Sequence, residues 1–94
     1  MAYKVRLSKK FASELDSICQ FIARDSEFFA TLFAQRVWVV VKMLNQFPEA
    51  GRIVPEYNDK LIREKFIGHY RLVYQIGKTT LRVLTICHGN RLLK

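Results

Sequence analysis

The sequence has little of several residue types on which small proteins often depend. Its 94 residues include two cysteines, two histidines, two prolines and four glycines. Cys19 and Cys87 are too few for a disulfide framework or a four-cysteine metal site, and neither the cysteines nor the histidines have a metal-ligand spacing. The segment GRIVPE holds a single glycine, so it is not a phosphate-cradling loop. We therefore expect reduced thiols, a cytoplasmic location, and neither a metal nor an organic cofactor.

Long hydrophobic runs are absent as well. The longest, Val37–Val41, is far shorter than the roughly 20 residues that span a bilayer. The N-terminus is charged from Lys4 and has no apolar stretch of signal-peptide length, so we expect no secretory signal. Half of the residues are nevertheless hydrophobic and seven are Phe, which predicts one packed domain over residues 1–94.

Acidic residues are outnumbered two to one. Sixteen Lys and Arg stand against eight Asp and Glu, which gives a net charge of +8 and a pI of about 9.9. A small basic domain often meets a polyanion, although charge alone is equally compatible with a solvated surface. The positive field is concentrated in the C-terminal third, where Glu64 is the only acid among Lys60, Arg63, Lys65, Arg71, Lys78, Arg82, Arg91 and Lys94.

The N-terminal half predicts a strand and a helical hairpin. Tyr3–Leu7 alternates as a strand does, and Ser8 is a good N-cap for a following helix. Apolar residues then recur at helical spacing as far as Ile22. A break at residues 25–27 is followed by a second helix that Pro48 ends, because the residue before proline is pushed out of helical geometry.

The C-terminal half predicts strands. Residues 46–59 contain both prolines and are expected to form a loop. Three strand candidates follow, joined by short connections that favour antiparallel pairing: Leu61–Phe66, Tyr70–Ile76 and Leu81–Cys87. We therefore predict an α+β fold. It comprises an N-terminal strand, a helical hairpin, and a three-stranded antiparallel meander that forms one small sheet with the first strand.

The predicted register gathers basic side chains on one face of the sheet. In the hairpin of the last two strands, opposed residues are expected to have numbers that sum to 157, so Tyr74 lies opposite Val83. In the preceding hairpin, a three-residue loop at 67–69 would place Lys65 opposite Arg71. Phe66 and Glu64 are then expected on the core side. The resulting cluster contains Arg63, Lys65 and Arg71, with His88 and Arg91 at the strand end. Such a cluster is either a solvated face or a site where arginine forks bind phosphate. We favour the site, because no ion-pair network is expected to neutralise these bases.

Several segments carry a resemblance to a known superfamily. The opening YKVRLSKKFASELDSI, the loop FPEAGR, the strand YRLVYQI and the terminal HGNR resemble the RelE/ParE superfamily of bacterial toxins from type II toxin–antitoxin systems. The resemblance covers nearly the whole chain. It implies the strand, helical hairpin and antiparallel sheet already predicted.

RelE-like members cleave mRNA in the ribosomal A site by metal-free attack of a ribose 2′-OH on phosphorus. The resemblance implies that Arg71 and Arg91 hold the phosphate, supported by Lys65. An RNA-binding set would comprise Arg63, Lys65 and Arg82. His88 is the candidate acid or base, and Glu56 is a second one, although a strand-end histidine and a loop carboxylate are as often structural. The late tyrosine of some members has no counterpart here.

ParE-like members lack a complete nuclease set and poison DNA gyrase by binding it. A degenerate toxin that binds only its antitoxin is a third alternative. Because a pure gyrase binder has no need of His88 beside two arginines, the sequence favours the mRNA endonuclease over the gyrase inhibitor. The expected partners are a cognate antitoxin, mRNA on the ribosome or else gyrase, and a second copy of the chain. Trp38 and Val41 are expected in the core, or at the contact with a second copy or an antitoxin helix.

Overall fold

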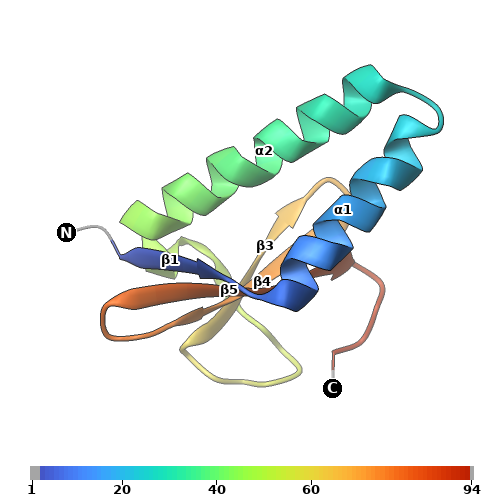
Figure 1. Ribbon diagram of the computed structural model, residues 1–94. Coiled ribbons are helices and arrows are strands. Elements are labelled where there is room, and N and C mark those ends of the chain that lie inside the picture. The colour runs from blue at the N-terminus through green and yellow to red at the C-terminus, as the bar shows by residue number, and fades with distance from the viewer. Residues whose placement is uncertain (1–2, 94) are drawn as a thin grey trace.

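The computed structural model describes residues 3–93, which form two helices on one face of a sheet (Figure 1). The five strands follow the order β1-β5-β4-β3-β2. In chain order the elements are β1 (Lys4–Leu7), α1 (Lys9–Ala23), α2 (Glu27–Gln46), the short 3-10 helix η1 (Pro48–Ala50), β2 (Arg52–Ile53), β3 (Ile62–Ile67), β4 (Tyr70–Ile76) and β5 (Thr80–His88). Within the described residues, neither helix combines the length and the apolar character that a membrane crossing requires.

The helices begin and end where local sequence signals place them. The Ser8 hydroxyl accepts a hydrogen bond from the Phe11 amide (2.9 Å), and Ser26 does the same for Phe29 (3.2 Å). Each hydroxyl satisfies a backbone N–H that has no partner inside its helix. The second helix ends at Gln46, just before Phe47 and Pro48. The predicted helical hairpin is therefore confirmed.

The sheet has one strand more than the sequence predicted. β1 runs parallel to β5 at one edge, and the remaining pairs are antiparallel. The opposite edge is β2, two residues long, inside the segment predicted as a loop. A strand this short has no alternation to detect. The chain just before β2 lies close to Tyr74 of β4 at Gly51. The Gly51 amide donates to the Tyr74 hydroxyl (3.0 Å), and a Cβ atom at position 51 would lie only 2.5 Å from that oxygen.

The predicted register between β3 and β4 is wrong by one residue. The turn contains two residues, Gly68 and His69, and Gly68 adopts the left-handed φ of 59° that glycine tolerates best. Arg71 consequently pairs with Phe66, and Lys65 pairs with Leu72. Because side chains alternate between faces, the shift moves the whole of β3 to the opposite side from that predicted.

A β-bulge interrupts the pairing of β4 with β5. The predicted pairs hold as far as Tyr74 and Val83, but Val73 pairs with Thr85 and leaves Leu84 as the extra residue. The α1 helix satisfies the polar groups that the bulge frees. Ser8 donates its hydroxyl to the Leu84 carbonyl (2.7 Å), and the Glu14 carboxylate accepts from the Ile86 amide (3.2 Å).

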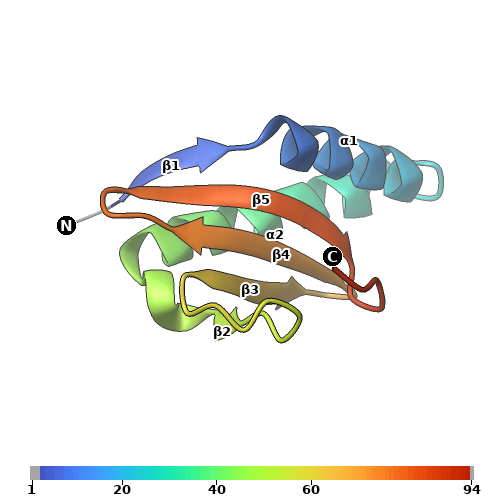
Figure 2. The same cartoon turned by 90° about the horizontal axis from the view of Figure 1, so that it is seen from below.

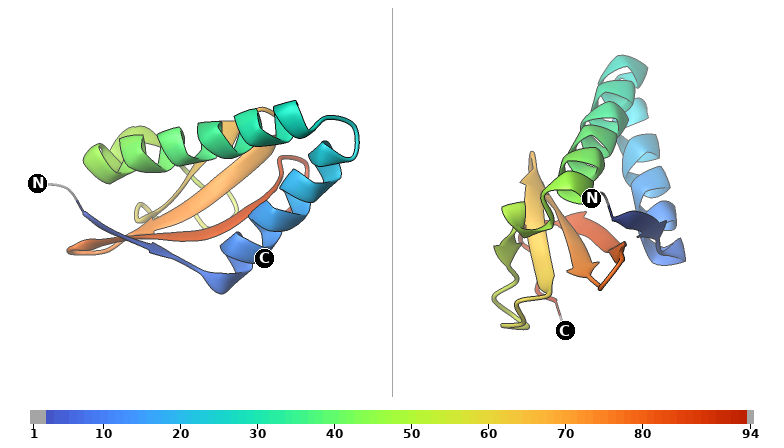
Figure 3. Two further views of the ribbon diagram at one scale, coloured as in Figure 1. Left: turned by 45° about the horizontal axis from the view of Figure 1, so that its top comes forward. Right: turned by 90° about the vertical axis from the view of Figure 1, so that its left-hand side faces the viewer.

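The core lies between the helices and the sheet. Fully buried side chains include Phe11, Val37 and Leu44 from the helices, and Leu72, Tyr74, Leu81 and Val83 from the sheet. Of the two residues whose position was left open between the core and an interface, Val41 is buried, whereas Trp38 packs edge-on against Phe11 and remains 40% exposed. Figures 2 and 3 show the helices on one side of the sheet. The opposite side, here called the outer face, carries the loop at 54–61 and the tail at 89–93 (Figure 2).

Candidate functional site

Arg71 occupies the centre of an ion-pair cluster on the outer face. Its side chain is 4% exposed and contacts two carboxylates. Nη1 donates to Glu64 Oε1 (2.7 Å) and to Glu56 Oε1 (3.3 Å), while Nη2 forms a very short contact with Glu56 Oε2. Arg52 completes the cluster from β2, with Nε 2.5 Å from Glu64 Oε2. The expectation that no ion-pair network neutralises these bases is therefore wrong.

The corrected register explains how the cluster forms. Glu64 pairs with Val73 and Arg71 pairs with Phe66, so Glu64 and Arg71 lie on the same face of neighbouring strands. Glu64 was expected to point toward the core, but it lies on the outer face. Its carboxylate has no exposed surface and is held between two arginines. A buried charge is tolerated only when it is paired in this way.

The tail after β5 is bound to the same cluster. Arg71 Nη2 donates to the Arg91 carbonyl oxygen (2.7 Å), and the Leu93 amide donates to Glu56 Oε2 (3.1 Å). The pKa of Glu56 is lowered from 4.5 to about 2. The largest cause is the hydrogen bond from Arg71, and the next is the hydrogen bond from the Leu93 amide. The Glu56 hydrogen bond in turn raises the pKa of Arg71. The groups are thus ionised at neutral pH, and the Arg71 charge is compensated within the protein.

Lys65 and Arg63 lie on the other side of the sheet from Arg71. Lys65 pairs with the buried core residue Leu72, whose side chain faces the helices. Arg63 Nε donates to the Lys60 carbonyl (2.9 Å), and its Nη1 donates to the Gly51 carbonyl (3.0 Å). Arg63 therefore holds the two ends of the segment between residues 51 and 60 at the sheet edge through hydrogen bonds. The predicted convergence of Arg63, Lys65 and Arg71 on one face is wrong.

His88 and Arg91 are exposed near the end of β5. The His88 ring stacks parallel to His69 at 6.4 Å and meets Tyr70 edge-on at 5.8 Å. Its Nδ1 accepts from the Asn90 amide (3.2 Å). His88 pairs with Tyr70, which packs on the core, so it does not share the face of Arg71. Arg82 is exposed on the outer face. The structure thus brings together Arg71, Glu56 and the Arg91 backbone, rather than Arg71, Lys65 and His88.

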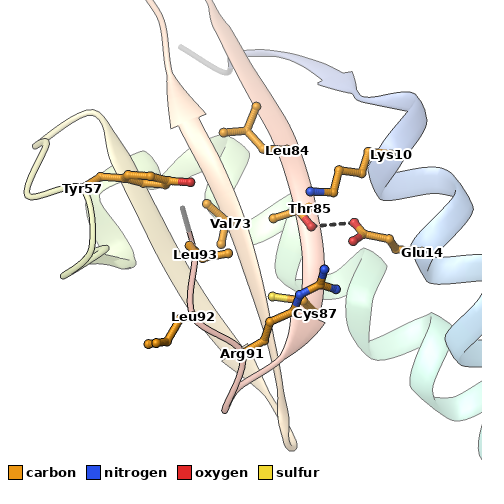
Figure 4. A pocket seen from close by; sticks show the side chains of 10 residues that line it. All are labelled: Lys10, Glu14, Tyr57, Val73, Leu84, Thr85, Cys87, Arg91, Leu92 and Leu93. Atoms are coloured by element: carbon orange, nitrogen blue, oxygen red, sulfur yellow. Dashed lines mark hydrogen bonds between the residues drawn. The ribbon is translucent and has the colours of Figure 1, made fainter.

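A pocket opens on the outer face beside this cluster (Figure 4). It measures about 440 Å³ and lies between α1, β5 and the tail. Its lining comprises Lys10, Glu14, Tyr57, Val73, Leu84, Thr85, Cys87, Arg91, Leu92 and Leu93. In it, Glu14 Oε1 accepts hydrogen bonds from the Thr85 hydroxyl (2.5 Å) and the Ile86 amide (3.2 Å), both of β5. The sequence did not indicate Lys10 and Glu14, since their approach to β5 is a contact between residues more than 70 positions apart with no local pattern.

Comparisons with known proteins identify a family from the sequence and similar folds among solved structures. A family model described as "ParE toxin of type II toxin-antitoxin system, parDE" matches residues 5–93. A chain of the chromosomal ParDE toxin–antitoxin system from P. aeruginosa is similar in fold, with a TM-score of 0.74 and 18% identity over 93% of this chain and 96% of that one. A chain of the toxin–antitoxin complex RelBE2 from Mycobacterium tuberculosis is also similar in fold, with a TM-score of 0.65. It is 22% identical over 94% of this chain and 99% of that one. A search of curated proteins gives no match.

Proposed function

Because the chain belongs to the ParE family of toxins from type II toxin–antitoxin systems, we propose that it acts by binding and inhibiting DNA gyrase, without cutting RNA itself. The resemblance to the RelE/ParE superfamily stands, but the preference within it is reversed. The sequence favoured the ribosome-dependent endonuclease because it predicted Arg71, Lys65 and His88 on one surface. That arrangement was the reason for preferring catalysis to binding.

The burial of Arg71 is the observation that carries the proposal. Phosphate recognition by arginine uses the guanidinium fork. In this protein Glu56, Glu64 and the Arg91 carbonyl engage both terminal nitrogens of Arg71. An incoming phosphate would have to displace two carboxylates. Lys65, on the other face, offers it no support from that position.

The proposed partner in the resting state is a cognate antitoxin. The P. aeruginosa and M. tuberculosis systems named above are both toxin–antitoxin assemblies. With a net charge of +8, the chain would favour an acidic partner. An acidic antitoxin segment that is disordered when free and folds on binding would offset this positive charge.

Two assays on the same purified protein test the proposal. In the first, gyrase supercoils relaxed plasmid in the presence of the chain, and cleaved gyrase–DNA complexes are trapped. In the second, mRNA ends are mapped by primer extension in a reconstituted translation system. We expect lost supercoiling with trapped DNA breaks, and intact mRNA. Ribosome-dependent cuts within codons, with gyrase unaffected, would overturn the proposal.

Ribosome-dependent mRNA cleavage is the second candidate. Two exposed side chains near the end of β5, His88 and Arg91, favour it. His88 would serve as acid or base and Arg91 as a phosphate ligand, with Arg71 and Lys65 in supporting roles and Arg63 and Arg82 contacting RNA. This candidate requires that Arg71→Ala and Arg91→Ala each abolish cleavage in the translation assay.

A further inference from the structure

We propose that the outer face of the sheet, along β5, binds the phosphate backbone of duplex DNA. The surface, here called the β5 basic track, comprises Lys4, Arg6, Lys10, Arg82 and Arg91. This inference goes beyond gyrase binding, because it gives the chain a direct contact with nucleic acid. It would add to the proposed function, since gyrase acts on DNA, but it does not depend on gyrase being the target.

The first part of the track follows from the pairing of β1 with β5. Arg6 is the register partner of Arg82, and the two strands are parallel, so both side chains lie on the same face. The residues flanking Arg82, Leu81 and Val83, are fully buried in the core. Arg82 and Arg6 must therefore point to the outer face, and Lys4, two residues before Arg6, points there too.

The second part continues along the same strand. Lys10, in the first turn of α1, reaches over β5 beside Thr85, and Arg91 lies beside Cys87 (Figure 4). The stretch from Arg82 to Cys87 spans about 16 Å at a strand rise of about 3.3 Å per residue. Because each strand of duplex DNA carries one phosphate per about 3.4 Å of helix axis, this length corresponds to an axial rise of about five base pairs.

In the part of the chain that the structure describes, no side chain of the track forms an ion pair. Within residues 3–93 the ion pairs involve only Arg52 and Arg71 as bases, and all five side chains of the track are exposed. One carboxylate, Glu14, lines the same pocket as Lys10 and Arg91 and accepts from Thr85 and Ile86, while Glu56 binds Arg71. Two arginines side by side on neighbouring strands repel each other, which a purely structural role does not explain.

The chemistry of the track favours duplex over single-stranded nucleic acid. Proteins that bind single strands stack bases on aromatic side chains between their basic residues. Within the described residues, Tyr57 is the one Tyr, Phe or Trp ring that lines the pocket shared by Lys10 and Arg91. Phe66 lies under the Arg52 guanidinium, and the other strongly exposed phenylalanines, Phe21, Phe28, Phe29 and Phe47, belong to the helical layer and the segment that follows it. Contacts to phosphates without base readout position a protein on duplex DNA independently of sequence.

The test measures binding of the full chain to a fluorescein-labelled duplex of about 24 base pairs by anisotropy, at about 50 to 200 mM salt. Wild type should bind, with an affinity that falls steeply as salt rises. The double variant R6Q/R82Q removes two contacts and should lower the slope of log Kd against log salt by about 1.8, because each phosphate contact contributes about 0.9. We expect its Kd at the lowest salt to rise at least tenfold.

The control R36Q/K42Q removes the same charge from exposed positions on α2. It should keep the wild-type slope. If R6Q/R82Q proves unfolded by circular dichroism, K4Q/K10Q takes its place with the same expected change. Any of four results would overturn the proposal: no wild-type binding at the lowest salt, an equal loss in the control, tighter binding of a single strand of the same length, or equally strong competition by polyglutamate at matched charge. Because no gyrase is present, these results are independent of the gyrase assay.

Discussion

At the scale of single residues, the ion-pair cluster around Arg71 decides how the outer face is interpreted. Glu64 contributes a carboxylate with no exposed surface, held by Arg52 and Arg71, and Glu56 supplies the second carboxylate from the loop. The sequence identified Arg71 as unusual but not its partners. Glu56 precedes it by 15 positions across a loop, and no local pattern predicts where such a loop returns to the sheet.

Removing Glu64 should destabilise the fold strongly. Glu64→Ala leaves Arg71 buried with a single carboxylate, and breaking a buried pair typically costs about 3 kcal/mol or more. Urea unfolding followed by circular dichroism measures the change. The matched control is Glu49→Ala, at an exposed carboxylate, which should stay within about 0.5 kcal/mol of wild type. Equal effects of the two substitutions would contradict the structural role given to Glu64.

The Glu56 carboxylate should make stability depend on pH in the acid range. Its pKa falls from 4.5 to about 2 on folding, chiefly through Arg71. A group whose pKa is lower in the folded state stabilises the fold above its unfolded pKa, and this contribution is lost as pH falls through the folded pKa. Wild type should therefore lose stability between pH 4.5 and about 2, and Glu56→Gln should flatten that part of the profile. Parallel profiles for the two proteins would refute this assignment.

At the scale of elements, the sequence predicted what is encoded locally. Ser8, Ser26 and Pro48 mark helix ends through hydrogen bonds and backbone constraints within a few residues. Strand register is different, because it depends on the length of one turn. A two-residue turn at Gly68 and His69 in place of three reversed the face of β3 and with it the predicted site. The bulge at Leu84 and the two-residue β2 have no sequence signal of comparable strength.

The two helix caps offer a test of how α1 is joined to the sheet. The Ser26 hydroxyl caps its own helix, whereas the Ser8 hydroxyl caps its helix and also donates to the Leu84 carbonyl at the bulge. Ser26→Ala should cost about 1 kcal/mol, and Ser8→Ala about 2 kcal/mol, because it leaves a second group unpaired. Urea unfolding of both variants gives the comparison. A larger loss for Ser26→Ala would show that the bulge contact contributes nothing.

At the scale of the whole molecule, charge and fold together define what the chain can bind. The sequence showed the net charge of +8 and the basic C-terminal third, but the predicted placing of Arg63, Lys65 and Arg71 on one face was wrong. The structure neutralises Arg71 internally, whereas the side chains of the β5 basic track form no ion pair within residues 3–93. Family membership and the buried Arg71 both favour a toxin that acts by binding over one that acts by catalysis.

The most direct test of that claim is a titration of purified chain against gyrase supercoiling relaxed plasmid, with protein–DNA breaks released by detergent and protease. We expect supercoiling to fall and linear DNA to accumulate as the chain is added, and a bound antitoxin to prevent both. Unchanged supercoiling at a large excess of the chain, together with ribosome-dependent mRNA cuts by the same preparation, would contradict it.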